Sequence, residues 1–381
     1  MAQLWTGGYE DGNFNWWRGA TGSYPYLNFV PAYGRPPENG GDGSLLSMET
    51  SPTRYGGYSA KFTVKNSENG TEEDNRDCDV GGVCSKRRTE LAQHSQMATY
   101  WGGILSYMTE RWICTSYYVP ADWDIENGSG FGPLVMQSHA ANMGSGGSPF
   151  FEIILTNTWR ISHRWSETLT QPIGGVPWYQ QSIYNGSSRP GSGESELLAD
   201  FPNETASRNA LANVNRGGWT DWIINVKYDA RGATSGGTGW LDIWKRANAD
   251  PWVHVLRIVP KQMTIGGYSN LSRGIGYWVP PLDEESIALG HSGSYENGGY
   301  GIGVGMYGAK EQFWDLPANR VIYNSNLRIH DEDTTFAEMT PEGEVDDGWN
   351  LQAQGISSSQ IKATWDAQDG ATGYELRYRK S

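Results

Sequence analysis

Three short strings, far apart along the chain, carry side chains that could together perform acid–base chemistry on an anionic substrate. They are Lys86-Arg87-Arg88-Thr89-Glu90-Leu91, Gln137-Ser138-His139 and Gly305-Met306-Tyr307. Because residues two apart in a β-strand lie on the same face, Arg88 would share a face with Glu90, and Gln137 with His139. A guanidinium, a carboxamide, an imidazole and a phenol would then meet in one polar site. We predict Arg88, Gln137, His139 and Tyr307 as its catalytic residues.

Further polar and aromatic side chains in or near the expected strands could hold a substrate beside that site. A locally basic surface would attract an anion even though the whole chain has a formal net charge of −14. We predict five substrate-binding residues: Lys86, Glu90, Arg160, His163 and Trp165. The alternatives stay open, because Glu90 could pair with a neighbouring cation and a single histidine is more often structural than catalytic.

Runs of β-branched and aromatic residues between glycine-rich turns predict an all-β fold. The 381 residues include 50 Gly, 18 Trp and 21 Tyr, and no long helical period appears. Trp and Tyr rings suit stacking on sugars, and they serve equally well in a core. We expect strands at 59–64, 86–94, 110–119, 131–139, 150–156, 159–165, 219–229, 239–246, 253–258, 300–308 and 320–329.

About a dozen strands with hairpin spacing predict a jelly-roll sandwich of two sheets, one of them curved into a concave groove. Residues 166–218 are expected to form a long loop, since Gly and Pro punctuate them. This sandwich would span residues 1–339. An acidic linker would follow at 340–348, and a further segment at 349–381.

The acidic balance argues against a nucleic-acid backbone as the main partner. No apolar run approaches the length of a membrane span, so we expect no membrane insertion. The start of the chain has no basic segment followed by an apolar one, and hence no visible signal peptide. Either the mature form carries an added Met or the protein leaves its cell by another route, for example within a phage particle. We therefore expect an extracellular or virion-associated protein.

The three cysteines fit no zinc-binding pattern. Cys78 and Cys84 bracket a glycine-rich loop and could form a small disulfide, whereas Cys114 is typical of a buried strand thiol. The acidic stretch 72–79 could hold calcium through its oxygens, but it lacks the spacing of an EF-hand loop, which favours a solvated loop. We predict no metal site and no required cofactor.

Residues 1–340 resemble the concanavalin-like polysaccharide lyases, the group of alginate, glucuronan and heparin-I-type lyases. Four places carry the resemblance: Arg88-Thr89-Glu90-Leu91, Gln137-Ser138-His139, the strand from Gly301 to Tyr307, and Trp219–Tyr228 with Gly239–Trp244. Two departures leave the subfamily open. Gly301 and Gly303 replace a Tyr and a Lys of the family pattern, and Ala92 replaces an Arg.

The resemblance implies cleavage of a uronate-containing, anionic polysaccharide by β-elimination. Such a lyase removes the proton at C5 of a uronic acid and expels the oxygen at C4. Arg88 and Gln137 would neutralise the carboxylate, and His139 or an ionised Tyr307 would be the base. Tyr307 could also protonate the leaving oxygen.

Residues 349–381 resemble the first strands of a fibronectin type III domain, with Trp365 and Tyr374 at the positions of its core aromatics. This segment could bind other virion or surface proteins. Two other functions compete with a lyase: a non-catalytic carbohydrate-binding, adhesin or phage-tail module, and a glycoside hydrolase. A hydrolase needs two carboxylates that flank the scissile bond, and Glu152 stands without a nearby acidic partner on its strand.

Overall fold

The computed structural model describes most of the chain, and it divides the chain into two compact units. The described residues are 3–6, 45–64, 76–78, 84–92, 105–106, 108–123, 133–140, 149–165, 180–185, 195–265, 268–276, 299–309, 320–340, 352–357 and 360–364. The first unit spans residues 1–334 and the second spans residues 335–381. Each unit is described by itself below.

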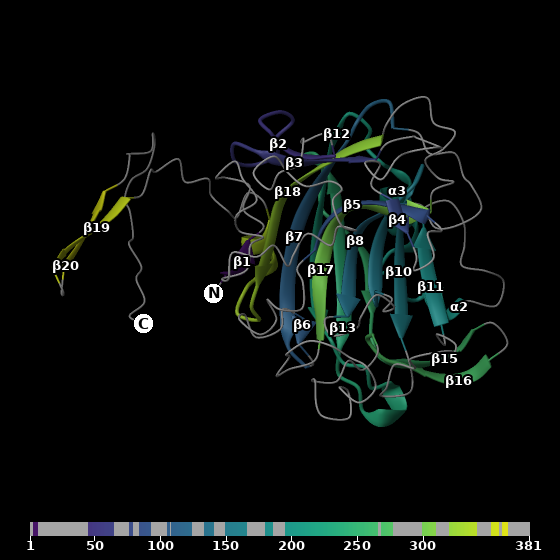
Figure 1. Ribbon diagram of the computed structural model, residues 1–381. Coiled ribbons are helices and arrows are strands. Elements are labelled where there is room, and N and C mark those ends of the chain that lie inside the picture. The colour runs from purple at the N-terminus through teal and green to yellow at the C-terminus, as the bar shows by residue number, and fades with distance from the viewer. Residues whose placement is uncertain are drawn as a thin grey trace. The chain divides into compact units, whose positions relative to one another are not determined.

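Two antiparallel sheets form the first unit, a jelly-roll sandwich (Figure 1). In the order of pairing, sheet A consists of β14 (Val253–Ile258), β13 (Trp240–Ala247), β12 (Gly218–Lys227), β7 (Glu110–Val119), β18 (Arg320–His330), β3 (Ser59–Val64) and β2 (Leu46–Glu49), with β1 (Gln3–Thr6) also paired to β18. Sheet B consists of β11 (Gln180–Asn185), β10 (Trp159–Trp165), β9 (Phe151–Leu155), β8 (Leu134–Ala140), β17 (Gly299–Ala309), β5 (Cys84–Ala92) and β4 (Arg76–Cys78), with β6 (Leu105–Ser106) also paired to β17.

The core lies between the two sheets because alternate residues of each strand are apolar. In β17, Tyr300, Ile302, Val304 and Met306 are all buried. Contacts cross from one sheet to the other: the Tyr117 hydroxyl donates to the backbone oxygen of Val135 at 2.8 Å. The expectation of an all-β jelly roll is confirmed, and four expected strands match β3, β7, β10 and β14 residue for residue. The concave groove stays a prediction.

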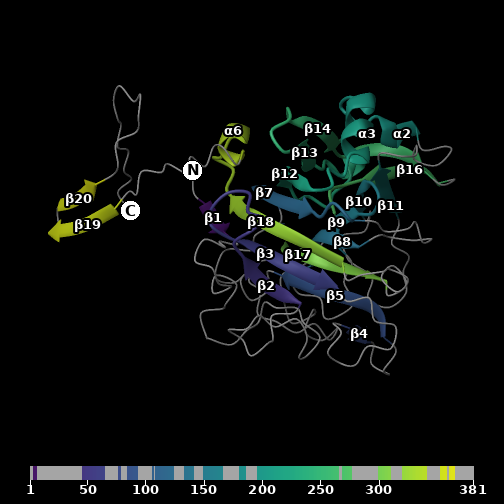
Figure 2. The ribbon, with the colours of Figure 1, turned by 90° about the horizontal axis from the view of Figure 1, so that it is seen from above.

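The expectation of a long loop at 166–218 is wrong. This segment contains β11, the short helix α2 (Ser195–Leu198) and the helix α3 (Glu204–Ala212). Asn203 caps α3 by accepting a hydrogen bond from the backbone N–H of Ala206 at 3.0 Å. Leu211 is buried, and α3 contacts β14, β10 and β11, so the helix closes one edge of the sandwich (Figure 2).

Three smaller elements complete the first unit and three belong to the second. The first unit also has the 3-10 turn η3 (Ala233–Ser235) and a hairpin of β15 (Lys261–Ile265) and β16 (Tyr268–Arg273). The second unit contains α6 (Phe336–Met339) and a hairpin of β19 (Gln352–Ser357) and β20 (Gln360–Thr364). This hairpin is the described part of the segment predicted to begin a fibronectin type III domain. Trp365 and Tyr374 lie outside the described residues, and the domain assignment stays a prediction.

Two cysteines lie opposite each other on neighbouring strands, and the third cysteine is buried. The register places Cys78 of β4 opposite Cys84 of β5. Directly opposed residues of antiparallel strands have Cα atoms about 4.5–5.5 Å apart, which is within the range that a disulfide bridges. The predicted disulfide is therefore compatible with the backbone. Cys114 is a buried free thiol, as expected. No helix in the described part of the chain is long and apolar enough to span a membrane.

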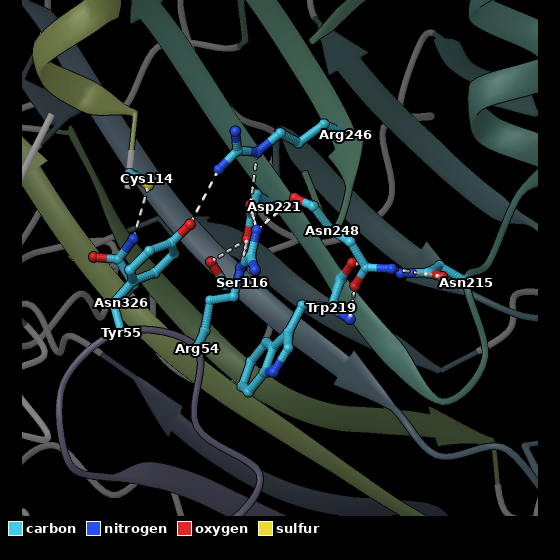
Figure 3. Close-up of polar contacts among 10 residues, drawn as sticks. All are labelled: Arg54, Tyr55, Cys114, Ser116, Asn215, Trp219, Asp221, Arg246, Asn248 and Asn326. Atoms are coloured by element: carbon cyan, nitrogen blue, oxygen red, sulfur yellow. Dashed lines mark hydrogen bonds and ion pairs between the residues drawn. The ribbon is translucent and has the colours of Figure 1, made fainter. Parts of the chain in front are cut away.

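A buried carboxylate ties a loop to the outer face of sheet A, the face turned away from the core (Figure 3). Asp221 of β12 accepts hydrogen bonds from Nε and Nη2 of Arg54 (3.1 and 2.8 Å), from Oγ of Ser116 (2.7 Å) and from Nε of Arg246 (2.8 Å). The Asp221 side chain is fully buried. These hydrogen bonds join the segment that carries Arg54 to strands β7, β12 and β13.

Lys245 of β13 is a buried cation beneath the end of α3. Its Nζ donates hydrogen bonds to the backbone oxygens of Ala210 (2.7 Å) and Asn213 (2.9 Å), and it lies 5.9 Å from the centre of the Trp222 ring. Burial, partly offset by the charge of Asp250, lowers the pKa of Lys245 from 10.5 to about 7.

This lowered pKa makes the stability of the fold depend on pH. Between pH 7 and 10.5 the unfolded chain holds a proton that the folded chain has lost, so the contribution of Lys245 to stability improves as the pH rises and is least favourable below pH 7. We measure the free energy of unfolding in urea at a series of pH values between 7 and 10.5. As the pH increases, the value for the wild type should rise relative to that for Lys245→Met, by up to about 1.4 kcal/mol per pH unit. Lys227→Met, at a partly exposed lysine, should follow the wild type. Parallel pH curves for the wild type and Lys245→Met would contradict the prediction.

Candidate functional site

The pairing of strands brings the four predicted catalytic positions onto one face of sheet B. Tyr307 of β17 lies opposite Arg88 of β5. On the other side of β17, Gly303 lies opposite Gln137 and Gly301 lies opposite His139 of β8. The intervening residues of β17 are buried in the core, so strand alternation puts positions 88, 137, 139 and 307 on the outer face of sheet B. Residues separated by more than 200 positions in sequence thus become neighbours across three strands.

Glycines line this face of β17 between the predicted catalytic positions. Gly301, Gly303 and Gly305 alternate with buried residues and lie on the same side as Tyr307. Gly305 has a φ of 146°, in a region that favours glycine, next to a bulge between β17 and β8. A strand face without side chains allows a ligand to approach the backbone closely. Gly301, Gly303 and Gly305 add no side chains to this strip, and all three are themselves buried.

A buried ion pair stands beside the predicted amide. Gln137 is buried and lies opposite Glu152 of β9. Both oxygens of Glu152 accept hydrogen bonds from Arg164 of β10, at 2.8 and 3.0 Å, and the Glu152 side chain is only 3% exposed. Sequence reasoning treated Glu152 as an isolated acid and missed this pair. The available signal was the β9–β10 hairpin, in which Glu152 faces Ser162 and Arg164 lies diagonally across.

Two predicted substrate-binding residues are in the core, and those predictions are wrong. His163 and Trp165 are 0% and 2% exposed, and their rings stack with centres 5.4 Å apart. They continue the inward alternation of Trp159 and Ile161 along β10, so they lie on the opposite face from Arg164. Burial, with the charges of Arg273 and Arg164, holds the pKa of His163 well below its ordinary value. A neutral, buried imidazole of this kind packs the core and does not contact a polysaccharide.

The other three predicted substrate-binding positions are on the outer face of sheet B. Position 86 pairs with 309 and position 90 pairs with 305, which places Lys86 and Glu90 in line with position 88. Arg160 pairs with Ile154 of β9 and shares the outer face with Arg164. Their roles in binding stay predictions.

The described residues contain no group of three or more His, Cys, Asp or Glu side chains that could hold a metal ion. Of the acidic stretch 72–79, for which a calcium role was considered, the structure describes only Arg76–Cys78. The remainder of that stretch lies outside the described residues.

Comparison with known proteins gives one family and several similar folds. A family model described as "Polysaccharide lyase" matches residues 10–276, a region that includes Arg88, Gln137 and His139 and ends before β17. Similar solved structures include an endo-β-1,4-glucuronan lyase from the fungus Trichoderma reesei, with 14% identity over 77% of this chain and 89% of that chain and a TM-score of 0.44. An alginate lyase from Klebsiella pneumoniae has 10% identity over 76% and 85%, with a TM-score of 0.38. A GH131 β-glucanase catalytic domain from Podospora anserina has 12% identity over 88% and 98%, with a TM-score of 0.37. No curated protein matches this chain in sequence.

Proposed function

The chain belongs to the polysaccharide lyase family and is a lyase that acts on a polysaccharide, and from this premise we propose that it cleaves a uronate-containing, anionic glycan by β-elimination. One observation carries the proposal: the positions of Arg88, Gln137, His139 and Tyr307 share one face of three adjacent strands. Such a set combines donors for a carboxylate with two groups able to move a proton.

The proposed reaction requires that a weakly acidic proton be removed beside a charged carboxylate. Donors from Arg88 and Gln137 would neutralise that carboxylate and stabilise the negative charge that develops. His139, or Tyr307 in its ionised form, would take the proton from C5 as the C4–O4 bond breaks and a C4–C5 double bond forms. Tyr307 is suited to returning a proton to the departing O4.

Hydrolysis by a carboxylate pair fits this face poorly. Glu90 and Glu152 are acids on the outer face near the predicted catalytic positions, and their strands β5 and β9 are three spacings apart in sheet B. Asp77 of β4 pairs with Lys86 and is a further acid on that face. The backbones of β5 and β9 are about 14 Å apart, whereas the paired carboxylates of glycosidases lie roughly 5–9.5 Å apart. Glu152 is also occupied by Arg164.

The proposal is tested by incubating the protein with a panel of uronate polymers, including alginate, glucuronan and heparin, and following ultraviolet absorbance. Elimination leaves a double bond conjugated to the carboxylate, so we expect absorbance to rise with at least one polymer. Chain shortening without absorbance would indicate hydrolysis. Binding without chain shortening would favour a carbohydrate-binding module, and either outcome would overturn the proposal.

A further inference from the structure

Arg160 has no carboxylate partner in the part of the chain that the structure describes. Its Nε is buried and has no hydrogen-bond partner there, and burial alone lowers its pKa below the ordinary value for arginine. Arg164, on the same strand and face, is neutralised by Glu152 and also donates to the backbone oxygen of Pro149 at 2.8 Å. Burying part of a guanidinium without a counter-charge is costly. Of the two arginines, Arg160 is the one that can gain a partner from a bound anion.

The register places Arg160 in one row with the predicted catalytic tyrosine. Tyr307 of β17 pairs with Leu134 of β8, Leu134 pairs with Ile154 of β9, and Ile154 pairs with Arg160 of β10. Figure 1 shows β17, β8 and β10 following one another across sheet B. Three strand spacings separate Arg160 from Tyr307, which is about 14 Å. The two residues between them are apolar, so Arg160 is the first charged side chain along this row.

We propose that Arg160 is a distal anion subsite, which binds the carboxylate of a uronate that is not the one being cleaved. This inference rests on the proposed function and extends it to the substrate. The separation is longer than one sugar ring, so a chain that reaches from Tyr307 to Arg160 must contribute a second acidic sugar at a set distance along the polymer. The enzyme would therefore prefer polymers that carry a second uronate at this distance to polymers in which acidic sugars are isolated. The planar guanidinium suits a carboxylate because it can donate two parallel hydrogen bonds.

The test measures KM and kcat for a series of oligouronates of increasing length, drawn from the polymer that the wild type cleaves. For the wild type we expect KM to fall once the oligomer is long enough to reach Arg160. For Arg160→Gln we expect this fall to disappear, with a KM about 10- to 100-fold higher on long oligomers. The shortest cleavable oligomer should show no difference. Arg160→Lys keeps the positive charge but cannot donate two parallel hydrogen bonds, so it should give an intermediate KM.

Arg257→Gln is the matched control, because Arg257 is an exposed arginine on β14 of the other sheet. It should behave as the wild type does. Equal KM values for the wild type and Arg160→Gln at every length would overturn the proposal, and so would a loss of the same size on the shortest oligomer. If the wild type cleaves no uronate polymer at all, the proposed function fails and the subsite falls with it. Activity without a length-dependent effect of Arg160→Gln refutes the subsite alone.

Discussion

His139→Ala and Tyr307→Phe should each lower kcat on the cleaved uronate polymer by about 10²- to 10⁴-fold, the usual contribution of a positioned acid or base. The reason is that position 307 on β17 and position 139 on the neighbouring β8 share the outer face of sheet B, where one residue would take the C5 proton and the other would serve the leaving oxygen. Initial rates of absorbance increase at saturating polymer measure the effect. KM should change much less than kcat, since the lost interactions act mainly in the transition state.

Two substitutions on the other sheet serve as controls for these variants. His254 of β14 and Tyr323 of β18 are partly exposed residues of the same types in sheet A. His254→Ala and Tyr323→Phe should keep the kcat of the wild type. If His139→Ala and Tyr307→Phe both retained full activity while folded, the site would be wrong even though the family is right. If only one of them lost activity, the other residue would be excluded as acid or base.

Asp221→Ala should lower the free energy of unfolding by about 3–5 kcal/mol, the range seen when one partner of a buried ion pair is removed. Asp221 is fully buried, and its loss would leave Arg54 and Arg246 without the carboxylate that both contact (Figure 3). Ser116 would also lose its acceptor. Urea unfolding at neutral pH measures this loss. The cluster lies on sheet A, away from the predicted catalytic positions, so kcat of the folded variant should stay close to that of the wild type.

Glu49→Ala supplies the matched comparison for Asp221→Ala. Glu49 forms an ion pair with Lys61 at 3.7 Å, in which both side chains are about one-third exposed. Exposed pairs contribute about 0–1 kcal/mol because water and salt screen them. A loss for Asp221→Ala no greater than that for Glu49→Ala would contradict the view that this cluster holds the loop of Arg54 on the sheet.

Local sequence patterns predicted the strands correctly where one side of a strand is buried. Alternation of apolar residues identified β7, β10 and β14 to the residue, because a strand that packs on a core must bury every second side chain. The same alternation could have shown that His163 and Trp165 face inward with Trp159 and Ile161. The helix α3 also had a local signal, the capping residue Asn203. The Gly and Pro residues of the segment 166–218 led to the prediction of a loop there.

By itself, the sequence determined the all-β class, the positions of most strands and the residue types of the predicted site. Only the tertiary structure decided which strands are neighbours, and hence that β17 lies between β5 and β8 with Tyr307 opposite Arg88. It also decided that Glu152 neutralises Arg164, whereas Arg160 has no such partner among the described residues. The physical reason is that alternation is a property of one strand, whereas register is set by pairing between segments far apart in the chain, where a shift of one residue would turn each side chain to the other face.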